Sequence, residues 1–194
     1  MESSITKETI SSLKQETFEG RIIVIQSLSE AEKAVRYLSS CHIIGFDTET
    51  RPSYKKGSYH SVALIQLSTE NTCFLFRLNI IGFPPCLIDL LSNPDVKKIG
   101  LSLGDDFAAI NRRYTFTPKG FFDLQKIVQG YGITDISLQK IYAIIFNKKI
   151  SKNQRLTNWE ADILTDSQKK YAALDAWACL KIYNKLNGKI ISTP

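Results

Sequence analysis

The sequence has 194 residues, of which 43% are hydrophobic and 23% are charged. This composition is that of an ordinary globular protein, and it excludes collagen-like, low-complexity and fully disordered chains. The 25 lysines and arginines exceed the 19 aspartates and glutamates, which gives a net charge of +6. Such an excess suits an anionic partner such as nucleic acid or a membrane surface, although many proteins without such a partner carry as much.

We expect neither a leader peptide nor a membrane-spanning segment. The first residues are polar and mixed in charge, without the apolar stretch of a signal peptide. No segment approaches the roughly 18 apolar residues of a membrane-spanning helix. The four cysteines are spread widely and form no C-x-x-C pair, which predicts reduced thiols rather than disulfides or a zinc site. These features predict a cytoplasmic protein.

Residues 1–20 are expected to form an N-terminal arm with a weak helix over 5–13. A β-branched segment then predicts a strand over 21–25. Ser29 and Glu32 have the spacing of a capping box for the helix that follows. The apolar residues on one face of that helix are Ala31, Ala34, Val35 and Leu38.

Three strands joined as an antiparallel meander are predicted next. They span residues 43–50, 61–68 and 72–77. A basic loop over 51–60 joins the first two, and Glu70-Asn71 forms the turn between the second and third.

Short helices and short strands alternate in the second half. The expected helices span 84–91, 105–113, 124–129 and 137–146, and the expected strands span 97–101 and 121–123. Thr165 and Gln168 form a second capping box, which opens a long helix to about residue 186. A meander followed by alternating helices and strands predicts one α/β domain over 21–194. Its sheet should be mixed, antiparallel on one side and parallel on the other.

Acidic residues occur in otherwise apolar segments at two places. Asp47 and Glu49 share one face of their strand because side chains alternate along it. Alone, such a pair is most simply explained as the solvated end of a strand. Asp175 lies in a helix segment that is apolar nearly all round, with Tyr171 one turn before it. A buried aspartate needs a hydrogen-bonding partner, a cation or a metal ion.

A third acidic place is Asp105-Asp106, at the start of a predicted helix. Helix capping and the helix dipole explain both residues without any catalytic role. Asp123 has an equally simple explanation as the cap of the helix after it. Nevertheless, four carboxylates from three separated segments are typical of two-metal hydrolysis, since Mg²⁺ prefers carboxylate and water oxygens.

The sequence resembles a known family at these same residues. Asp47-x-Glu49, then Asp106, then Tyr171-x-x-x-Asp175 resembles the three exonuclease motifs of the DEDD superfamily, in its tyrosine branch. Ribonuclease D and the Werner-type exonucleases belong to this branch. Similarity to the Werner-type group runs through residues 61–67, 96–100, 158–159 and 164–176, and the resemblance covers about 41–186.

The resemblance implies a ribonuclease-H-like fold, 3′→5′ removal of nucleotides and two divalent cations, Mg²⁺ or Mn²⁺. The residues that would hold the ions are Asp47, Glu49, Asp106 and Asp175. Tyr171 would orient the attacking water. The family's spacing selects Asp106 rather than Asp105 as the ligand, which leaves Asp105 as the expected helix cap. The other branch carries a histidine where this chain has Lys170, so the tyrosine form is implied.

Basic residues gather in two loops near these motifs. One loop contains Lys148, Lys149, Lys152 and Arg155, and Lys55 and Lys56 follow the strand that carries Asp47 and Glu49. Most lysines and arginines only keep a surface solvated, but phosphate contacts supply sequence-independent affinity for nucleic acid. We predict such contacts for Arg155, Lys152, Lys55 and Lys56.

Together these features predict a metal-dependent 3′→5′ exonuclease that acts on single-stranded ends of DNA or RNA. One alternative is a nucleic-acid-binding or adaptor domain with weak or no catalysis, although such a domain has no need for unpaired buried acids. Another alternative is a hydrolase of small phosphate compounds.

Overall fold

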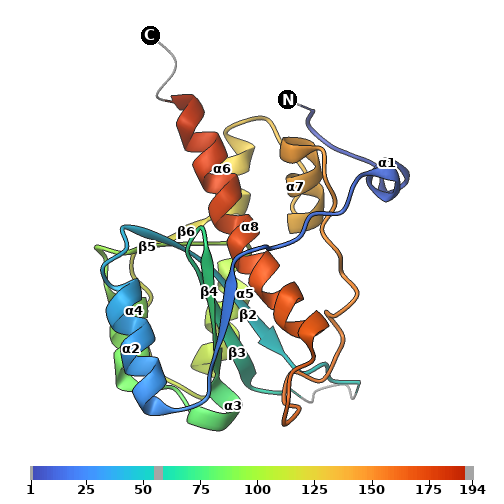
Figure 1. Ribbon diagram of the computed structural model, residues 1–194. Helices are drawn as coiled ribbons and strands as arrows, with labels where there is room; N and C mark the ends of the chain where they lie inside the picture. The colour runs from blue at the N-terminus through green and yellow to red at the C-terminus, as the bar shows by residue number, and fades with distance from the viewer. Residues whose placement is uncertain (1, 55–58, 191–194) are drawn as a thin grey trace.

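The computed structural model describes residues 2–54 and 59–190, and Figure 1 shows helices on both sides of one mixed sheet. The sheet has six strands in the order β1-β4-β3-β2-β5-β6. The strands are β1 (Arg21–Ile25), β2 (Ile43–Thr50), β3 (Val62–Ser68), β4 (Thr72–Arg77), β5 (Lys97–Gly100) and β6 (Phe121–Asp123).

The helices divide between the two faces of this sheet. The helices are α1 (Lys7–Ser12), α2 (Leu28–Leu38), α3 (Leu78–Ile81), α4 (Pro85–Ser92), α5 (Leu103–Asn111), α6 (Leu124–Gln129), α7 (Leu138–Phe146) and α8 (Asp166–Ile190). One hydrophobic core joins the sheet to α6, α7 and α8, and a second joins it to α2, α4 and α5. Within the described residues, no helix is both long and apolar enough to cross a membrane.

The predicted mixed sheet is confirmed, with one difference in its arrangement. Strands β2, β3 and β4 form the expected antiparallel meander, and β5 and β6 continue the sheet in parallel. β1 pairs with β4 and is also parallel. The antiparallel strands therefore occupy the centre of the sheet, with parallel pairs at both edges. The central strand β3 is buried along its whole length.

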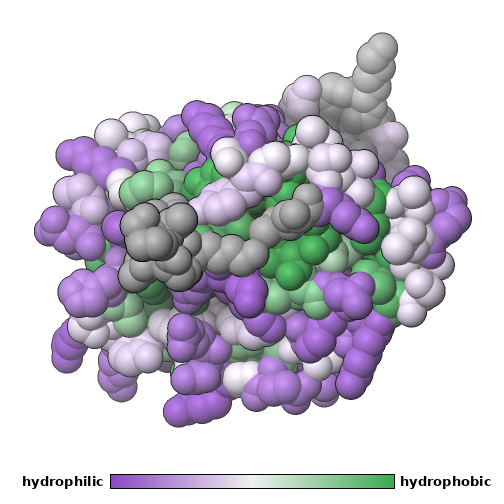
Figure 2. Space-filling view, turned by 90° about the horizontal axis from the view of Figure 1, so that it is seen from above, coloured by the Kyte–Doolittle hydropathy of each residue, from purple (hydrophilic) through white to green (hydrophobic). Residues whose placement is uncertain are grey.

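Hydrophilic side chains cover most of the surface seen from above, around a smaller hydrophobic area (Figure 2). The same division is present within single helices. In α2 the residues predicted to face inward, Ala31, Ala34, Val35 and Leu38, are all buried. The sequence pattern of this helix therefore fixed which of its faces packs on the sheet.

The capping box of α2 lies two residues before the predicted one. The Ser27 hydroxyl accepts a hydrogen bond from the Glu30 backbone N–H at 3.3 Å, and the Glu30 carboxylate accepts one from the Ser27 N–H at 3.0 Å. Ser29 and Glu32 are inside the helix. The sequence offers both spacings, and the extended backbone at Ser27, with φ −138° and ψ 158°, selects the first.

The sequence predicted Asp105 as the cap of α5, but the cap is Asp123, which ends β6. The carboxylate of Asp123 accepts hydrogen bonds from the N–H groups of Ser102 and Leu103, at 3.1 and 3.0 Å. It also accepts one from Gln125 at 2.9 Å and so caps α6, as predicted. Asp105 lies inside the first turn of α5, because this helix begins at Leu103. One carboxylate at the end of β6 therefore fixes the starts of two helices.

The remaining boundaries agree closely with the sequence. The capping box of Thr165 and Gln168 is confirmed, with hydrogen bonds of 3.0 and 3.2 Å in the two directions. α8 continues to Ile190 rather than to about residue 186. Ser137 precedes α7 as expected, but its side chain makes no capping bond within the described residues. The short helix α3 was not predicted.

The N-terminal segment, residues 2–20, lies against α7 and α8 (Figure 1). Ile5 and Ile10 pack with Ala143 of α7. Phe18 is buried and meets the Trp177 ring of α8 edge-on, with centroids 5.8 Å apart. The weak helix expected here is α1. This segment is therefore packed against the rest of the protein over most of its length.

Glu16 is the buried charge of the N-terminal segment, with 7% of its surface exposed. Its carboxylate accepts hydrogen bonds from the Tyr142 hydroxyl at 2.6 Å, the Lys148 ammonium at 3.0 Å and the Lys181 ammonium at 3.1 Å. Burial alone would raise its pKa, but these three donors lower the pKa from 4.5 to about 2.

Glu16→Gln should therefore remove the part of the unfolding free energy that depends on an ionised Glu16. Because the folded-state pKa lies below the unfolded value, the stabilisation is complete above pH 4.5 and is lost as the pH falls towards 2. The variant should lose up to about 3 kcal/mol of unfolding free energy at pH 7, and this difference should shrink in acid. Urea unfolding at several pH values measures it, with Glu19→Gln as the control. An equal difference at every pH would contradict the assignment.

Candidate active site

The site begins with the close approach of β2 to α8 at Gly45. A Cβ atom at this position would lie 1.9 Å from the backbone oxygen of Ala176, so only glycine allows the strand and the helix to lie so close. Asp47 follows Gly45 by two residues and lies on the same face of β2, and Asp175 directly precedes Ala176. The strand and the helix thereby bring their acidic residues together.

Three of the predicted acidic residues converge at this contact. Asp47, Glu49 and Asp175 each offer a carboxylate oxygen, and these oxygens all lie within 4.8 Å of one another. Glu49 and Asp175 are each only 8% exposed. We call these three residues the carboxylate cluster. Such a set of hard oxygen ligands is suited to Mg²⁺ or Mn²⁺.

Burial and mutual repulsion oppose ionisation of the carboxylate cluster. Burial raises the pKa of Asp47 well above its usual value, and the charges of Asp175 and Asp106 raise it further. Burial, followed by the charge of Asp47, raises the pKa of Glu49 to about 10, and burial raises that of Asp175 to about 7. A bound cation would offset this repulsion.

Asp106 reaches the site from the first turn of α5. β5 pairs with β2 only as far as Gly45, and the Thr48 hydroxyl beyond it donates a hydrogen bond of 2.5 Å to Asp106. Burial raises the pKa of Asp106 to about 7. It lies outside the carboxylate cluster, although its charge acts on Asp47. Asp105, by contrast, is exposed.

Tyr171 lies one turn before Asp175, as the sequence predicts, and is 8% exposed. Its hydroxyl interacts with the Asp175 carboxylate and lowers the pKa of that group. Burial and the neighbouring carboxylates raise the pKa of Tyr171, so the hydroxyl keeps its proton. Its ring lies beside Trp159, with centroids 6.0 Å apart. The residue therefore offers a protonated hydroxyl next to the carboxylate cluster.

The carboxylate cluster opens into a cleft of about 390 Å³. Lys152 and Arg155, two of the predicted nucleic-acid contacts, line this cleft together with Tyr171. The positive charge of Lys152 acts on Asp175, and that of Arg155 acts on Glu49. The cleft thus combines acids that can hold cations with basic side chains that can meet phosphates.

Lys148 and Lys149, the other two basic residues of the loop between α7 and α8, do not line this cleft. Lys148 binds Glu16, and the ammonium of Lys149 donates to the Ser11 carbonyl oxygen at 2.5 Å. Lys55 and Lys56 lie outside the described residues. The basic residues of the loop between α7 and α8 are therefore divided into two pairs. Lys148 and Lys149 bind the N-terminal segment, and Lys152 and Arg155 line the cleft.

Several residues of the site were not predicted from the sequence. Thr48 orients Asp106, and its only sequence signal is its place between two acids on a strand. Other unpredicted residues that line the cleft include Ile136, Ser137, Leu138, Gln139 and Ser151. These come from the segments around α7, and no periodic pattern relates them to the acids.

Comparison with known proteins yields one family. A model of the 3′-5′ exonuclease family matches residues 22–191. The bifunctional 3′-5′ exonuclease/ATP-dependent helicase WRN of Mus musculus is 33% identical over 179 residues, which cover 87% of this chain and 13% of that protein. Ribonuclease D of Haemophilus influenzae is 32% identical over 138 residues, 70% of this chain and 34% of that protein. The chain therefore spans a minor part of these two relatives.

A solved structure agrees with the family in fold. Trypanosoma brucei RNase D, crystallised in complex with the RNA U12, superposes with a TM-score of 0.78 and 19% identity over 88% of this chain and 64% of that one. Its similarity bears on the fold alone. The ribonuclease-H-like architecture implied by the sequence is thereby confirmed.

Gly45→Ala should destabilise the protein strongly. The added methyl group would meet a backbone oxygen that cannot move aside, so we expect a loss of about 3 kcal/mol or more of unfolding free energy. Gly104→Ala is the matched control, because its Cβ would meet nothing within 4 Å in α5, and it should stabilise by about 0.5–1 kcal/mol. Urea unfolding compares them, and equal effects would contradict the close approach.

Proposed function

Since this chain belongs to the 3′-5′ exonuclease family, we propose that it removes nucleotides from the 3′ end of single-stranded DNA or RNA by metal-dependent hydrolysis. The observation that carries the proposal is the convergence of Asp47, Glu49 and Asp175 in a cleft that Lys152 and Arg155 also line. The family relation alone leaves open which residues act.

The residues fit two divalent cations, Mg²⁺ or Mn²⁺. The proposed ligands are Asp47, Glu49, Asp106 and Asp175. Three of these carboxylates are close enough to share an ion, and their raised pKa values reflect a charge that lacks compensation. When bound, such ions supply Lewis acidity and neutralise the charge that develops on the phosphate.

The chain's own side chains then position the reactants. The Tyr171 hydroxyl, one helix turn from Asp175, orients the attacking water, and Lys152 and Arg155 contact the phosphates of the strand. The water oxygen forms a bond to the last phosphorus as the bond from that phosphorus to the 3′ oxygen of the preceding nucleotide breaks. A proton passes to this 3′ oxygen. The products are a nucleoside 5′-monophosphate and a strand one nucleotide shorter.

The substrate class, the domain division and the location are part of this proposal. The RNA bound by the Trypanosoma brucei relative favours a nucleic-acid substrate, and Lys55 and Lys56 remain proposed contacts. Residues 21–194 form the exonuclease domain, and residues 1–20 its arm. The four cysteines are free thiols, as expected of a protein in the reducing cytoplasm. Binding without catalysis is not favoured, because a binding surface has no need for the carboxylate cluster.

The proposal is tested by digestion of single-stranded DNA and RNA oligonucleotides labelled at the 5′ end. With Mg²⁺ or Mn²⁺ we expect a ladder of products that shorten from the 3′ end, and with EDTA no products. Intact oligonucleotides under all conditions would contradict the proposal. Hydrolysis of small phosphate esters without a ladder would support the alternative of a small-molecule hydrolase.

Asp106→Asn and Asp105→Asn should separate the two adjacent acids. Asp106 accepts a hydrogen bond from Thr48 and its charge acts on Asp47, whereas Asp105 is exposed. Asp106→Asn should lower the single-turnover rate by about 100-fold or more, and Asp105→Asn should leave it within about twofold. The reverse pattern would show that Asp105 serves the site.

Tyr171→Phe should slow the chemical step and leave substrate binding nearly unchanged. The ring remains packed while the hydroxyl that orients water is lost, so kcat should fall by about 10- to 100-fold with little change in KM. Tyr131→Phe is the control, because it removes a hydroxyl that donates to the Leu186 carbonyl oxygen and does not line the cleft. An unchanged single-turnover rate for Tyr171→Phe would mean that this residue serves packing alone.

A further inference from the structure

The N-terminal segment runs beside the beginning of the loop between α7 and α8, residues 147–165. Gln15 and Lys149 form a short parallel bridge. The Lys149 N–H donates to the Lys14 carbonyl oxygen at 3.0 Å, and the Glu16 N–H donates to the Lys149 carbonyl oxygen at 2.8 Å. These backbone bonds join two segments that lie more than a hundred residues apart in the sequence, and they fix the position of the loop at Lys149.

The side chain of Glu16 strengthens this attachment from within. Its carboxylate binds Lys148 of the loop, Tyr142 of α7 and Lys181 of α8. Since each donor belongs to a different element, a single buried acid fixes the start of the loop relative to the two helices. Gln139 of α7 adds a hydrogen bond of 2.8 Å to the Ile150 carbonyl oxygen.

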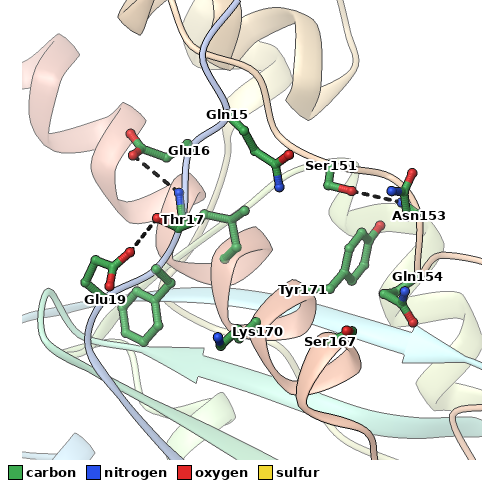
Figure 3. A pocket seen from close by; sticks show the side chains of 12 residues that line it. Gln15, Glu16, Thr17, Glu19, Ser151, Asn153, Gln154, Ser167, Lys170 and Tyr171 are labelled. Atoms are coloured by element: carbon green, nitrogen blue, oxygen red, sulfur yellow. Dashed lines mark hydrogen bonds between the residues drawn. The ribbon is translucent and has the colours of Figure 1, made fainter.

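The loop enters the cleft directly after this attachment. Ile150, Ser151, Lys152 and Arg155 line the cleft. Figure 3 shows a second pocket of about 300 Å³, which is lined by Gln15 of the N-terminal segment, Ser151 of the loop and Tyr171 of α8. The loop therefore lines two pockets, one shared with the N-terminal segment and one shared with the carboxylate cluster.

We propose that Glu16 is a positioning residue for substrate binding, which holds the loop so that Lys152 and Arg155 face the phosphates in the cleft. This inference rests on the proposed exonuclease function. Glu16 touches neither substrate nor the reacting atoms, so it acts through the two basic residues. Its loss should weaken the electrostatic capture of the strand without changing the chemical step.

The first experiment compares Glu16→Gln with Glu19→Gln. Both variants lose one negative charge from the same segment, but Glu19 is exposed and accepts a hydrogen bond only from Thr17 within the described residues. Steady-state digestion is measured at a temperature below the melting of every variant. Glu16→Gln should raise KM about fivefold and leave kcat within about twofold, and Glu19→Gln should change neither. A fall in kcat alone, or equal KM values, would overturn the proposal.

A double-mutant cycle shows whether the effect passes through the loop. In a Lys152→Ala/Arg155→Ala background, Glu16→Gln should raise KM by much less than in the native background, because the groups that it positions are gone. An equal increase in both backgrounds would show a general structural effect and overturn the proposal. If Glu16→Gln does not fold, Lys148→Ala serves in its place, because it breaks only the link to the loop.

Binding without turnover separates this inference from the proposed function. The affinity of a single-stranded oligonucleotide is measured by fluorescence anisotropy in the Asp175→Asn background, with and without Glu16→Gln. A Kd weakened about fivefold supports the positioning role, and an unchanged Kd contradicts it. The absence of any cleavage by the native protein would contradict the proposed function instead.

Discussion

Repulsion among Asp47, Glu49 and Asp175 is the interaction on which the rest of the site depends. Burial raises the pKa of all three carboxyl groups, and the charges of neighbouring carboxylates raise those of Asp47 and Glu49 further. The backbone holds them together nevertheless, because Gly45 lets α8 lie against β2. Charge of this kind inside a protein is stable when a cation compensates it. The fold therefore concentrates electrostatic repulsion at a place where a bound divalent cation would relieve it.

The basic residues complement this arrangement because the N-terminal segment divides them. Glu16 takes up the charges of Lys148 and Lys181, and Lys152 and Arg155 lie at the cleft. Thus the net charge of +6 is less informative than the position of a few cations. A cleft lined by both carboxylates and basic side chains can attract metal ions and a phosphate backbone to the same place.

Local patterns predicted most elements but not the contacts between them. The strands over 21–25, 43–50, 72–77 and 121–123 agree to the residue, because β-branched and aromatic runs end there at polar or turn residues. Alternation placed Asp47 and Glu49 on one face, and helix spacing placed Tyr171 one turn from Asp175. The choice of Asp106 depended on the family resemblance, because adjacent acids at a helix start look alike in sequence.

The failures concern information that the local sequence does not hold. Ser27 and Ser29 offer the same capping pattern, and the backbone at the helix start decides between them. Asp123 caps α5 across 20 residues, which displaced Asp105 from that role. Thr48 acquires its role only when α5 lies beside β2, and the buried partner of Lys148 is a glutamate 132 residues away.

The central claim is that the carboxylate cluster binds a divalent cation, and thermal unfolding tests it most directly. A cation that binds only the folded state raises the melting temperature with its concentration. We expect Mg²⁺ and Mn²⁺ to raise the melting temperature of the native protein and to have a much smaller effect on Asp175→Asn. A melting temperature of the native protein that does not change with either ion would contradict the account.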